Sequence, residues 1–343
     1  MPDALAPKLP VENVKCFAGA GHKWMGEGNE RELWLMPTTL RRRSSPRIAI
    51  MGNIIDTPFN TTAKVSCLVS NGVGAVVRYY NFSNSLNFPG KCLELAEAQA
   101  LSSEGVRIAV VFQQRQNQVA DFTELKGKAA GRRAYRHAHD SIGQSAGSAI
   151  YFAVDFDAGP SEIQNNIAPY FAGVKRAFDE ESEGAPAYRI GAYGSGLVCG
   201  TLTQRGLIDF VWLAMSRGFS GTREALAAGE FHLAQRAPAA SLCGLGVDFN
   251  DPNPARPDFG TFTLSADSPE HGSIGPVAAR FRVIARGGLR LREGPGTQFD
   301  IIGGLPFGQT VSVVSVSEGW AHVDIEGDGR SDGFASAGFL ERI

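Results

Sequence analysis

The sequence of 343 residues is poor in the features that mark several common protein classes. No apolar run approaches the roughly 18 residues needed to cross a bilayer, so we predict no membrane span. The net charge of −2 gives no reason to expect nucleic acid or an anionic membrane as a partner. Residues 1–10 lack a basic stretch followed by an apolar core. The sequence therefore shows no standard secretory signal and leaves the export route open.

Cysteine is scarce and scattered. The five cysteines are Cys16, Cys67, Cys92, Cys199 and Cys243. No two of them form a C-x-x-C pair, and none has a metal-type spacing with histidine, so we predict no bound metal. Because the number is odd, at least one thiol is unpaired. We expect buried free thiols, and a disulfide such as Cys67 to Cys92 is the alternative.

Two catalytic signatures are missing as well. The sequence has no P-loop, and Gly194-Ser195-Gly196 lacks the G-x-S-x-G pattern of a nucleophile elbow. We therefore predict neither a nucleotide cofactor nor any other cofactor, and no Ser-His-Asp hydrolysis. These absences leave acid–base chemistry by carboxylates as the main option.

What the sequence does contain is an alternation of short β-type runs with helical patterns. The β-type runs are 47–56, 74–80, 106–112, 148–155, 188–193, 209–215, 230–235 and 245–249. Helical segments separate the early runs, as in 161–179, where apolar residues recur on one stripe. This alternation predicts an α/β fold, and eight repeats favour a (β/α)8 TIM-type barrel. The short interval between the last two runs leaves no room for a crossover helix, so we expect an irregular barrel.

Composition divides the chain into four parts. We predict an N-terminal extension at 1–46, where no periodicity is clear, and the barrel at 47–263. Residues 264–280 have the composition of a linker. In 281–343, short β runs alternate with Gly and Pro turns, which predicts a small all-β domain.

The run that begins at Ile150 ends in two acids, Asp155 and Asp157. On a strand, the i, i+2 spacing puts both carboxylates on one face. Barrel enzymes place their catalytic groups at this end of their strands. The alternative is an ordinary turn, because Asp157 is followed closely by Gly159-Pro160.

Other predicted strand ends also carry polar or aromatic side chains. They are Asp56, Arg78, Tyr79, Gln113, Tyr193, Gln235, Asp248 and Asn250. Four aspartates converging on one rim would repel one another if they served only as caps, which favours a functional cleft. The tyrosines supply faces on which sugars can stack. Acids combined with aromatic faces indicate glycoside hydrolysis.

Five short motifs resemble a known family. They are Ile55-Asp56-Thr57, Val77-Arg78-Tyr79, Tyr151-Phe152-Ala153-Val154-Asp155-Phe156-Asp157, Gly191-Ala192-Tyr193 and Val247-Asp248-Phe249-Asn250. They are similar to the glycoside-hydrolase-like TIM-barrel family first catalogued as domain of unknown function 1906. That family is itself similar to the family 25 lysozymes, which cleave the sugar backbone of peptidoglycan. The resemblance covers about residues 47–262.

The resemblance implies roles for the acids. The lysozymes carry D-x-E on the fourth strand, with the Glu as general acid, and Asp157 stands at that position here. The acids of their first and eighth strands match Asp56 and Asp248. The implied site therefore has Asp157 as proton donor, with Asp155 and Asp56 assisting. Substrate contacts are expected from the following residues: Arg78, Tyr79, Gln113, Tyr193, Gln235 and Asn250.

The C-terminal segment resembles a second family. Leu289-Arg290-Leu291-Arg292-Glu293-Gly294-Pro295-Gly296 and Glu318-Gly319-Trp320 look like signatures of a bacterial SH3 domain. This resemblance implies an SH3-like small barrel that targets the cell wall. The turn at 324–332 opens like a calcium loop, but Ala335 stands where an EF-hand needs its bidentate Glu, which favours a plain hairpin.

Two functions remain open from the sequence. The first is a lysozyme-like glycoside hydrolase that acts on peptidoglycan or a related amino-sugar polymer, at the cell wall or outside the cell. The second is a non-catalytic protein with a degenerate barrel that binds cell-wall carbohydrate. Both predict a polysaccharide partner, and only the first requires a proton donor.

Overall fold

The computed structural model describes residues 52–264 and 279–343. The predicted N-terminal extension lies outside these residues, as does all but the ends of the predicted linker. Across the two described ranges, no helix has both the length and the apolar character that a membrane crossing requires.

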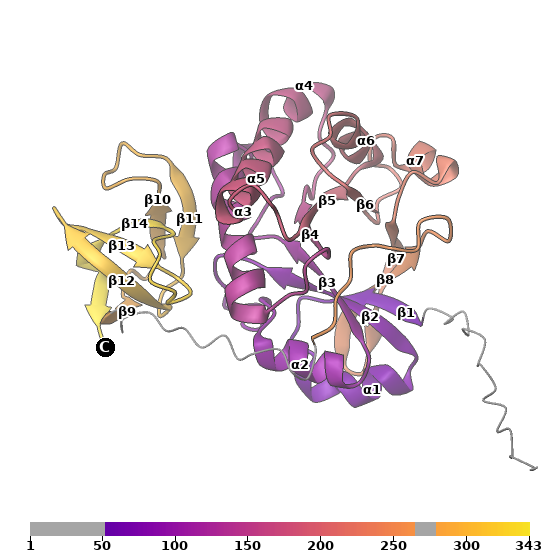
Figure 1. Ribbon diagram of the computed structural model, residues 1–343, viewed down its shortest axis with the longest axis horizontal. Coiled ribbons are helices and arrows are strands. Elements are labelled where there is room, and N and C mark those ends of the chain that lie inside the picture. The colour runs from indigo at the N-terminus through magenta and orange to yellow at the C-terminus, as the bar shows by residue number, and fades with distance from the viewer. Residues whose placement is uncertain (1–51, 265–278) are drawn as a thin grey trace, which may run out of the picture. The chain divides into compact units, whose positions relative to one another are not determined.

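Eight strands form a closed barrel (Figure 1). They are β1 (Asn53–Asp56), β2 (Val73–Tyr80), β3 (Arg107–Phe112), β4 (Ala149–Ala153), β5 (Arg189–Gly194), β6 (Phe210–Leu213), β7 (Leu233–Leu242) and β8 (Leu245–Pro252). Neighbouring strands from β1 to β7 are parallel, whereas β8 is antiparallel to both β7 and β1. The predicted irregular barrel is confirmed. Its irregularity is a β7–β8 hairpin, because the connection is too short for a helix.

Helices connect the parallel strands. The α-helices are α1 (Val65–Ser70), α2 (Leu95–Ser103), α3 (Glu124–Arg136), α4 (Pro160–Glu162), α5 (Ala168–Glu181), α6 (Gly196–Gln204) and α7 (Thr222–Ala228). Shorter 3-10 or π turns lie at Thr62–Lys64, Val119–Asp121, His137–Ile142 and Ile163–Ile167. Helices α3 and α5 pack backbone to backbone, since a Cβ on Gly127 would lie 1.9 Å from the carbonyl oxygen of Tyr170. Only glycine permits this approach.

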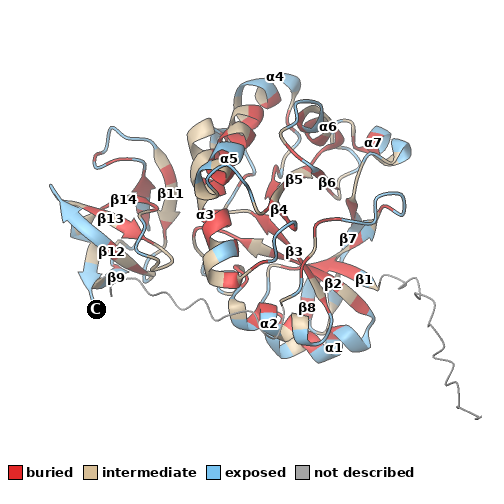
Figure 2. Ribbon diagram, in the orientation of Figure 1, coloured by how far each residue is buried: buried red, intermediate tan, exposed pale blue. Residues whose placement is uncertain are grey.

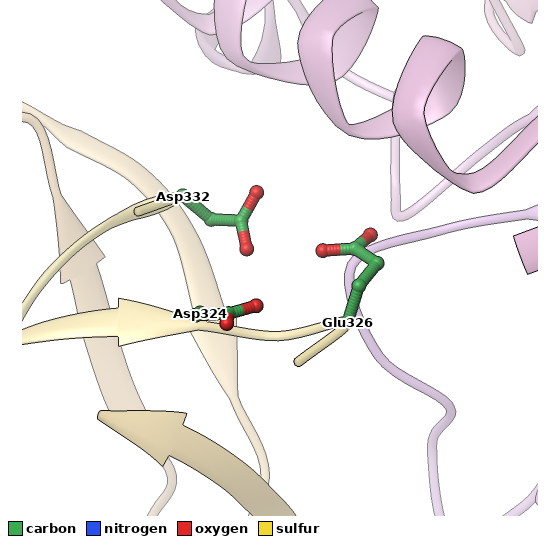
Figure 3. A group of neighbouring side chains, drawn as sticks. All are labelled: Asp324, Glu326 and Asp332. Atoms are coloured by element: carbon green, nitrogen blue, oxygen red, sulfur yellow. The ribbon is translucent and has the colours of Figure 1, made fainter. Parts of the chain in front are cut away.

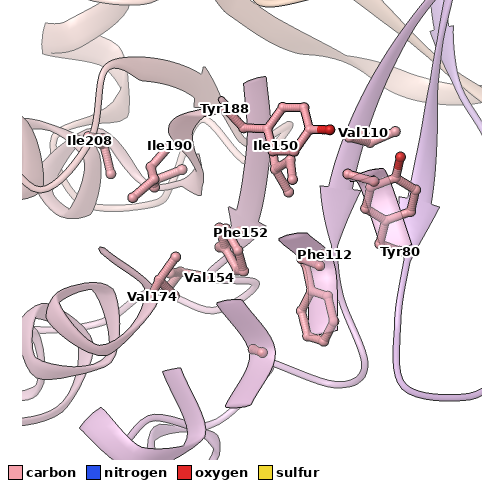
Figure 4. Close-up of a cluster of buried hydrophobic side chains, with 14 of the residues drawn as sticks. Tyr80, Val110, Phe112, Ile150, Phe152, Val154, Val174, Tyr188, Ile190 and Ile208 are labelled. Atoms are coloured by element: carbon pink, nitrogen blue, oxygen red, sulfur yellow. The ribbon is translucent and has the colours of Figure 1, made fainter. Parts of the chain in front are cut away.

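The strand residues alternate between two apolar layers. In β3, Ala109 and Val111 belong to the cluster inside the barrel, whereas Val110 and Phe112 belong to the cluster beneath the helices. Figure 4 shows part of this outer cluster, and Figure 2 shows the strands as the most buried elements of the barrel. The alternation decides which strand residues can reach the barrel mouth.

Strand β4 is shorter than predicted. It ends at Ala153, two residues before the end of the predicted 148–155 run. Asp155 and Asp157 therefore lie in the loop that follows, and the prediction that they share one face of a strand is wrong. The apolar run stops at Val154, and the next residues leave the sheet.

One disulfide, between Cys67 and Cys243, joins α1 to the tip of the β7–β8 hairpin. The expectation of free buried thiols is met by Cys92 and Cys199 and is wrong for this pair. Cys16 lies outside the described residues. The two bonded cysteines are 176 residues apart in the sequence, so only closure of the barrel brings them together.

The C-terminal segment forms an antiparallel sheet. Its strands are β9 (Ala279–Val283), β10 (Leu289–Arg292), β11 (Ile301–Leu305), β12 (Thr310–Ser317), β13 (Trp320–Asp324), β14 (Gly333–Ser336) and β15 (Leu340–Arg342), with a 3-10 turn at Ala337–Phe339. Leu291, Val311, Ala321 and Val323 are almost fully buried in a core of their own. The predicted small all-β domain is confirmed.

Candidate active site

A cavity of about 650 Å³ lies at the carboxyl ends of the parallel strands. Its lining residues are Tyr79, Val111, Gln113, Ala153, Asp155, Tyr193, Trp212, Ala214, Met215, Ser216, Arg217, Phe219, Gln235, Ala237 and Asp248. Asp155 continues the inward parity of Tyr151 and Ala153, so it projects over the barrel mouth although it follows the strand. Sugar-sized ligands fit a cavity of this volume.

Asp56 lies behind this cavity at the end of β1, and it is only 2% exposed. Its Oδ2 accepts a hydrogen bond from Asn250 Nδ2 at 2.8 Å, and Tyr79 donates a longer one of 3.5 Å to its Oδ1. Burial, reinforced by the charge of Asp248, raises the pKa of Asp56 to about 7, although its hydrogen bonds act in the opposite direction. Asp56 can therefore hold a proton near neutral pH.

Gln235 joins the two acids of this group. Its Nε2 donates to Asp56 Oδ2 at 3.1 Å and to Asp248 Oδ2 at 3.1 Å. Its Oε1 accepts from the hydroxyl of Tyr193 at 2.8 Å. Asp248 keeps a buried Oδ1 with no hydrogen-bond partner among the described residues, and burial raises the pKa of Asp248. One amide thus fixes two carboxylates and leaves one acceptor atom unsatisfied.

Asp155 stands on the opposite wall. Gln113 Nε2 donates to its Oδ2 at 3.2 Å, and Lys91 Nζ donates to the Gln113 carbonyl oxygen at 3.0 Å. Lys91 Nζ also lies 4.7 Å from the centre of the Tyr79 ring. Loss of water around Asp155 raises its pKa, while the Gln113 bond and the Lys91 charge oppose the rise. Burial in turn lowers the pKa of Lys91 to about 8.

Two predicted site residues lie elsewhere. Asp157 does not line the cavity, and its two oxygens accept from Ser220 N at 2.8 Å and Ser220 Oγ at 3.1 Å. Arg78 is fully buried and points outward from β2, where it forms a two-pronged ion pair with Glu97 at 2.7 and 3.0 Å. The prediction that Arg78 contacts substrate is wrong, because its parity is opposite to that of Tyr79.

Other lining residues were missed from the sequence. Trp212, which is buried in the cluster inside the barrel, also forms part of the cavity wall and donates from Nε1 to Asn250 Oδ1 at 2.8 Å. Lys91 does not line the cavity but contacts Gln113 and the Tyr79 ring, and it lies in a loop where no sequence pattern predicted it. The β6–α7 loop contributes Met215, Ser216, Arg217 and Phe219. The one available signal was the position of this loop after a strand end.

The C-terminal domain has an acidic group of its own. Asp324, Glu326 and Asp332 have carboxylate oxygens within 4.8 Å of one another (Figure 3). Asp324 already accepts from the backbone amides of Gly327 at 2.6 Å and Gly329 at 2.8 Å, and Asp332 accepts from Ile325 N at 2.7 Å. These amides supply positive partners from the turn itself. Neither oxygen of Glu326 has a hydrogen-bond partner among the described residues.

The cavity combines groups that suit acid–base chemistry on a sugar. Three carboxyl groups, Asp56, Asp155 and Asp248, have raised pKa values caused mainly by burial. The rings of Tyr79, Tyr193 and Trp212 line the same space. A proton donor, a carboxylate and aromatic faces are the parts that glycosidic bond cleavage requires.

Residues 66–241, more than half of the chain, match the Rv2525c-like, glycoside hydrolase-like domain, and residues 287–341 match the bacterial SH3 domain. Two proteins of Bacillus subtilis (strain 168) are similar to part of the chain. Uncharacterized protein YbfG is 34% identical over 168 residues, which are 47% of this chain and 22% of YbfG. Uncharacterized protein FadG is 29% identical over 166 residues, which are 47% of this chain and 27% of FadG. The chain thus spans only about a quarter of these relatives.

Solved structures show a weaker likeness. The Mycobacterium tuberculosis Tat-secreted protein Rv2525c, in complex with HEPES, is 22% identical, with 62% of this chain and 98% of that chain covered and a TM-score of 0.47. The Clostridium perfringens spore cortex lytic enzyme SleM is 14% identical, with 85% and 96% covered and a TM-score of 0.33. The extent of the family match decides the assignment: the chain belongs to the Rv2525c-like, glycoside hydrolase-like domain family and carries a bacterial SH3 domain.

Proposed function

We propose that the protein hydrolyses a glycosidic bond in peptidoglycan or a related amino-sugar polymer. The observation that carries the proposal is that Asp155 and Asp248 line one cavity with Tyr193, whose hydroxyl bonds the same Gln235 that donates to Asp248 and to Asp56. Burial raises the pKa of Tyr193 far above its usual range, and the charges of Asp155, Asp56 and Asp248 raise it further. Two acids therefore face the cavity, and the third, Asp56, lies behind it within the same hydrogen-bond network.

In this proposal Asp155 donates the proton to the leaving oxygen. It stands at the open rim, and its raised pKa favours the protonated form that a general acid needs. It replaces Asp157, the donor favoured from the sequence, because both oxygens of Asp157 are bonded to Ser220. Asp155 returns to its protonated form when it takes a proton from the attacking water.

Asp248 faces the reacting sugar from the other wall, with Asp56 behind it. The buried and unsatisfied Oδ1 of Asp248 suits a group that either stabilises positive charge on the sugar or orients an N-acetyl amide. Gln235, which also bonds Asp56, holds Asp248 in place. Tyr79, Tyr193 and Gln113 complete the proposed substrate contacts, and Asn250 supports them by fixing Asp56.

The remaining features support a role at the cell wall or outside the cell. The disulfide between Cys67 and Cys243 favours an oxidising compartment. The SH3 domain at 287–341 is proposed to bring the barrel to its polymer. The polysaccharide partner and the location are therefore proposed, as the reaction is.

The test is whether the purified protein cleaves glycosidic bonds and so releases new reducing ends. Wild type is incubated with bacterial wall sacculi and with soluble amino-sugar oligosaccharides, and products are identified by mass spectrometry. We expect glycosidic fragments that disappear in Asp155→Asn and persist in Asp258→Asn. Asp258 is a matched control because it is an exposed aspartate paired with Arg189, outside the cavity lining.

A second function is favoured by one observation. Only one of the two acids of the D-x-D sequence, Asp155, lines the cavity. A barrel that binds wall polysaccharide without cleaving it would not need Asp157, the second acid of this sequence, in the cavity. Binding to sacculi with no fragments from any substrate tested would select this function over hydrolysis.

A further inference from the structure

The β6–α7 loop is held firmly on one wall of the cavity. Its first residue, Ala214, donates its amide to Gly194 O at 2.9 Å, and Met215 N donates to Gln235 at 3.3 Å. At the other end, Ser220 O accepts from Leu197 N at 2.9 Å. A loop fixed at both ends presents its central side chains in defined positions.

Asp157 is part of this anchoring. Both of its oxygens are bonded to Ser220, at 2.8 Å to the amide and 3.1 Å to the hydroxyl. The close approach of α6 to the loop leaves no space for a side chain, since a Cβ on Gly196 would lie 2.0 Å from Gly221 O. The acid thus connects the β4 loop to the β6–α7 loop and takes no place in the cavity.

The central side chain of this loop is Arg217. It lines the cavity, it is exposed, and no ion pair or hydrogen bond occupies it within the described residues. Asp155 and Asp248 line the same cavity, yet Arg217 pairs with neither. The wall therefore offers one unused guanidinium, a group that matches a carboxylate through two parallel hydrogen bonds.

We propose that the β6–α7 loop recognises a carboxylate carried by the sugar polymer, with Arg217 as the binding group and Asp157 as the residue that positions the loop. The inference deepens the proposed function, on which it rests, by naming the substrate class as an acidic amino-sugar glycan. The carboxylate can be borne by a lactyl ether or by a uronic acid ring, and both present the same two oxygens.

The experiment measures binding by calorimetry and keeps catalysis out of the comparison by using the Asp155→Asn background. Three disaccharides are compared: N-acetylglucosaminyl-N-acetylmuramic acid, N,N′-diacetylchitobiose, and a glucuronic acid–N-acetylglucosamine disaccharide. The first two differ mainly by the lactyl carboxylate. We expect a roughly 5- to 10-fold tighter Kd for at least one acidic disaccharide, as suits a charge-assisted contact at an exposed rim. Which acidic ligand shows it identifies the source of the carboxylate.

Variants decide whether Arg217 is responsible. Arg217→Gln should bring the ratio of the affinities to about one, and Arg223→Gln, which removes the same charge from α7 outside the cavity lining, should leave the ratio unchanged. Asp157→Ala should lower the ratio through loss of loop position, and Asp157→Asn should restore part of it because an amide oxygen still accepts from Ser220 N. A general loss of folding would change both affinities together and leave the ratio intact.

Equal binding of acidic and neutral disaccharides by the unmutated loop overturns the inference, as does binding of neither, or a preference that survives in Arg217→Gln. The proposed hydrolysis fails separately. If the protein prefers the acidic disaccharide but releases no fragments, the inference stands and the proposed hydrolysis is overturned. If the protein cleaves acidic and neutral disaccharides equally, the proposed hydrolysis stands and the inference is overturned.

Discussion

Asp324 of the 324–332 turn and the aspartates at the barrel mouth are the same residue type in opposite situations. In the turn, Asp324 is bonded to three successive backbone amides, of Gly327, Asp328 and Gly329. At the mouth, Asp155 and Asp248 are bonded by side-chain amides and face a cavity. Backbone amides fix an acid as part of the fold, whereas side-chain amides hold it in place and leave an oxygen for a ligand. An aspartate therefore indicates chemistry only when its partners leave an acceptor oxygen free.

The largest expected effect tests this difference directly. Asp155→Asn keeps the shape of the side chain and removes its proton, so hydrolysis should fall by about 10²–10⁴-fold. Asp324→Asn should leave the turnover of a soluble oligosaccharide within about twofold, because Asp324 is not among the residues that line the cavity. Initial rates from a reducing-end assay provide the measurement. Equal losses in the two variants would break the comparison.

Glu97 extends the comparison to a buried acid of the barrel domain whose carboxylate is held by an ion pair and hydrogen bonds. It is fully buried and accepts from Arg78 Nε at 2.7 Å and from Thr61 N at 2.7 Å. Glu97→Gln leaves the guanidinium without a counter-charge, so the free energy of unfolding should fall by about 3–5 kcal/mol. Urea denaturation measures the change. The exposed pair of Arg176 and Glu124 is the control, and Arg176→Met should cost less than about 1 kcal/mol.

Asp56 should make stability depend on pH. Its pKa is 3.8 when unfolded and about 7 when folded, so the folded state binds more protons between these values. Stability is therefore greatest below about pH 4 as far as this group is concerned, and it falls as the pH rises to 7, by on the order of 4 kcal/mol. Asp56→Asn should remove this slope from denaturation curves collected across the range. An unchanged slope in the variant would show that Asp56 ionises normally.

The smallest effect concerns the turn itself. Asp324→Asn retains one acceptor oxygen and loses its charge, so the C-terminal domain should lose about 1–2 kcal/mol of stability. Because the acid is held by amides, a chelator should not change the unfolding temperature of the wild type. Calorimetry with and without EDTA measures both quantities. A chelator-induced fall in Tm would instead show that the three carboxylates hold a cation.

Much of the site could be predicted by counting along strands. Tyr79, Gln113, Tyr193, Gln235 and Asp248 follow apolar runs, and all five line the cavity. Attention to alternation within the same run would also have excluded Arg78, because neighbouring strand residues face opposite layers. The prediction for Arg78 failed because all residues at the strand end were treated alike, without regard to the face on which each side chain lies.

The sequence by itself determined the eight β-type runs, the irregular closing pair and the small β domain, because apolar periodicity and turn residues are local properties. Only the tertiary structure decided that Asp157 bonds Ser220 and does not line the cavity, since Ser220 belongs to a loop 63 residues away in the sequence. The same holds for the disulfide of Cys67 and Cys243 and for Arg217 at the cavity wall. Each depends on where a loop lies after the barrel closes, and no local pattern encodes a contact between distant loops.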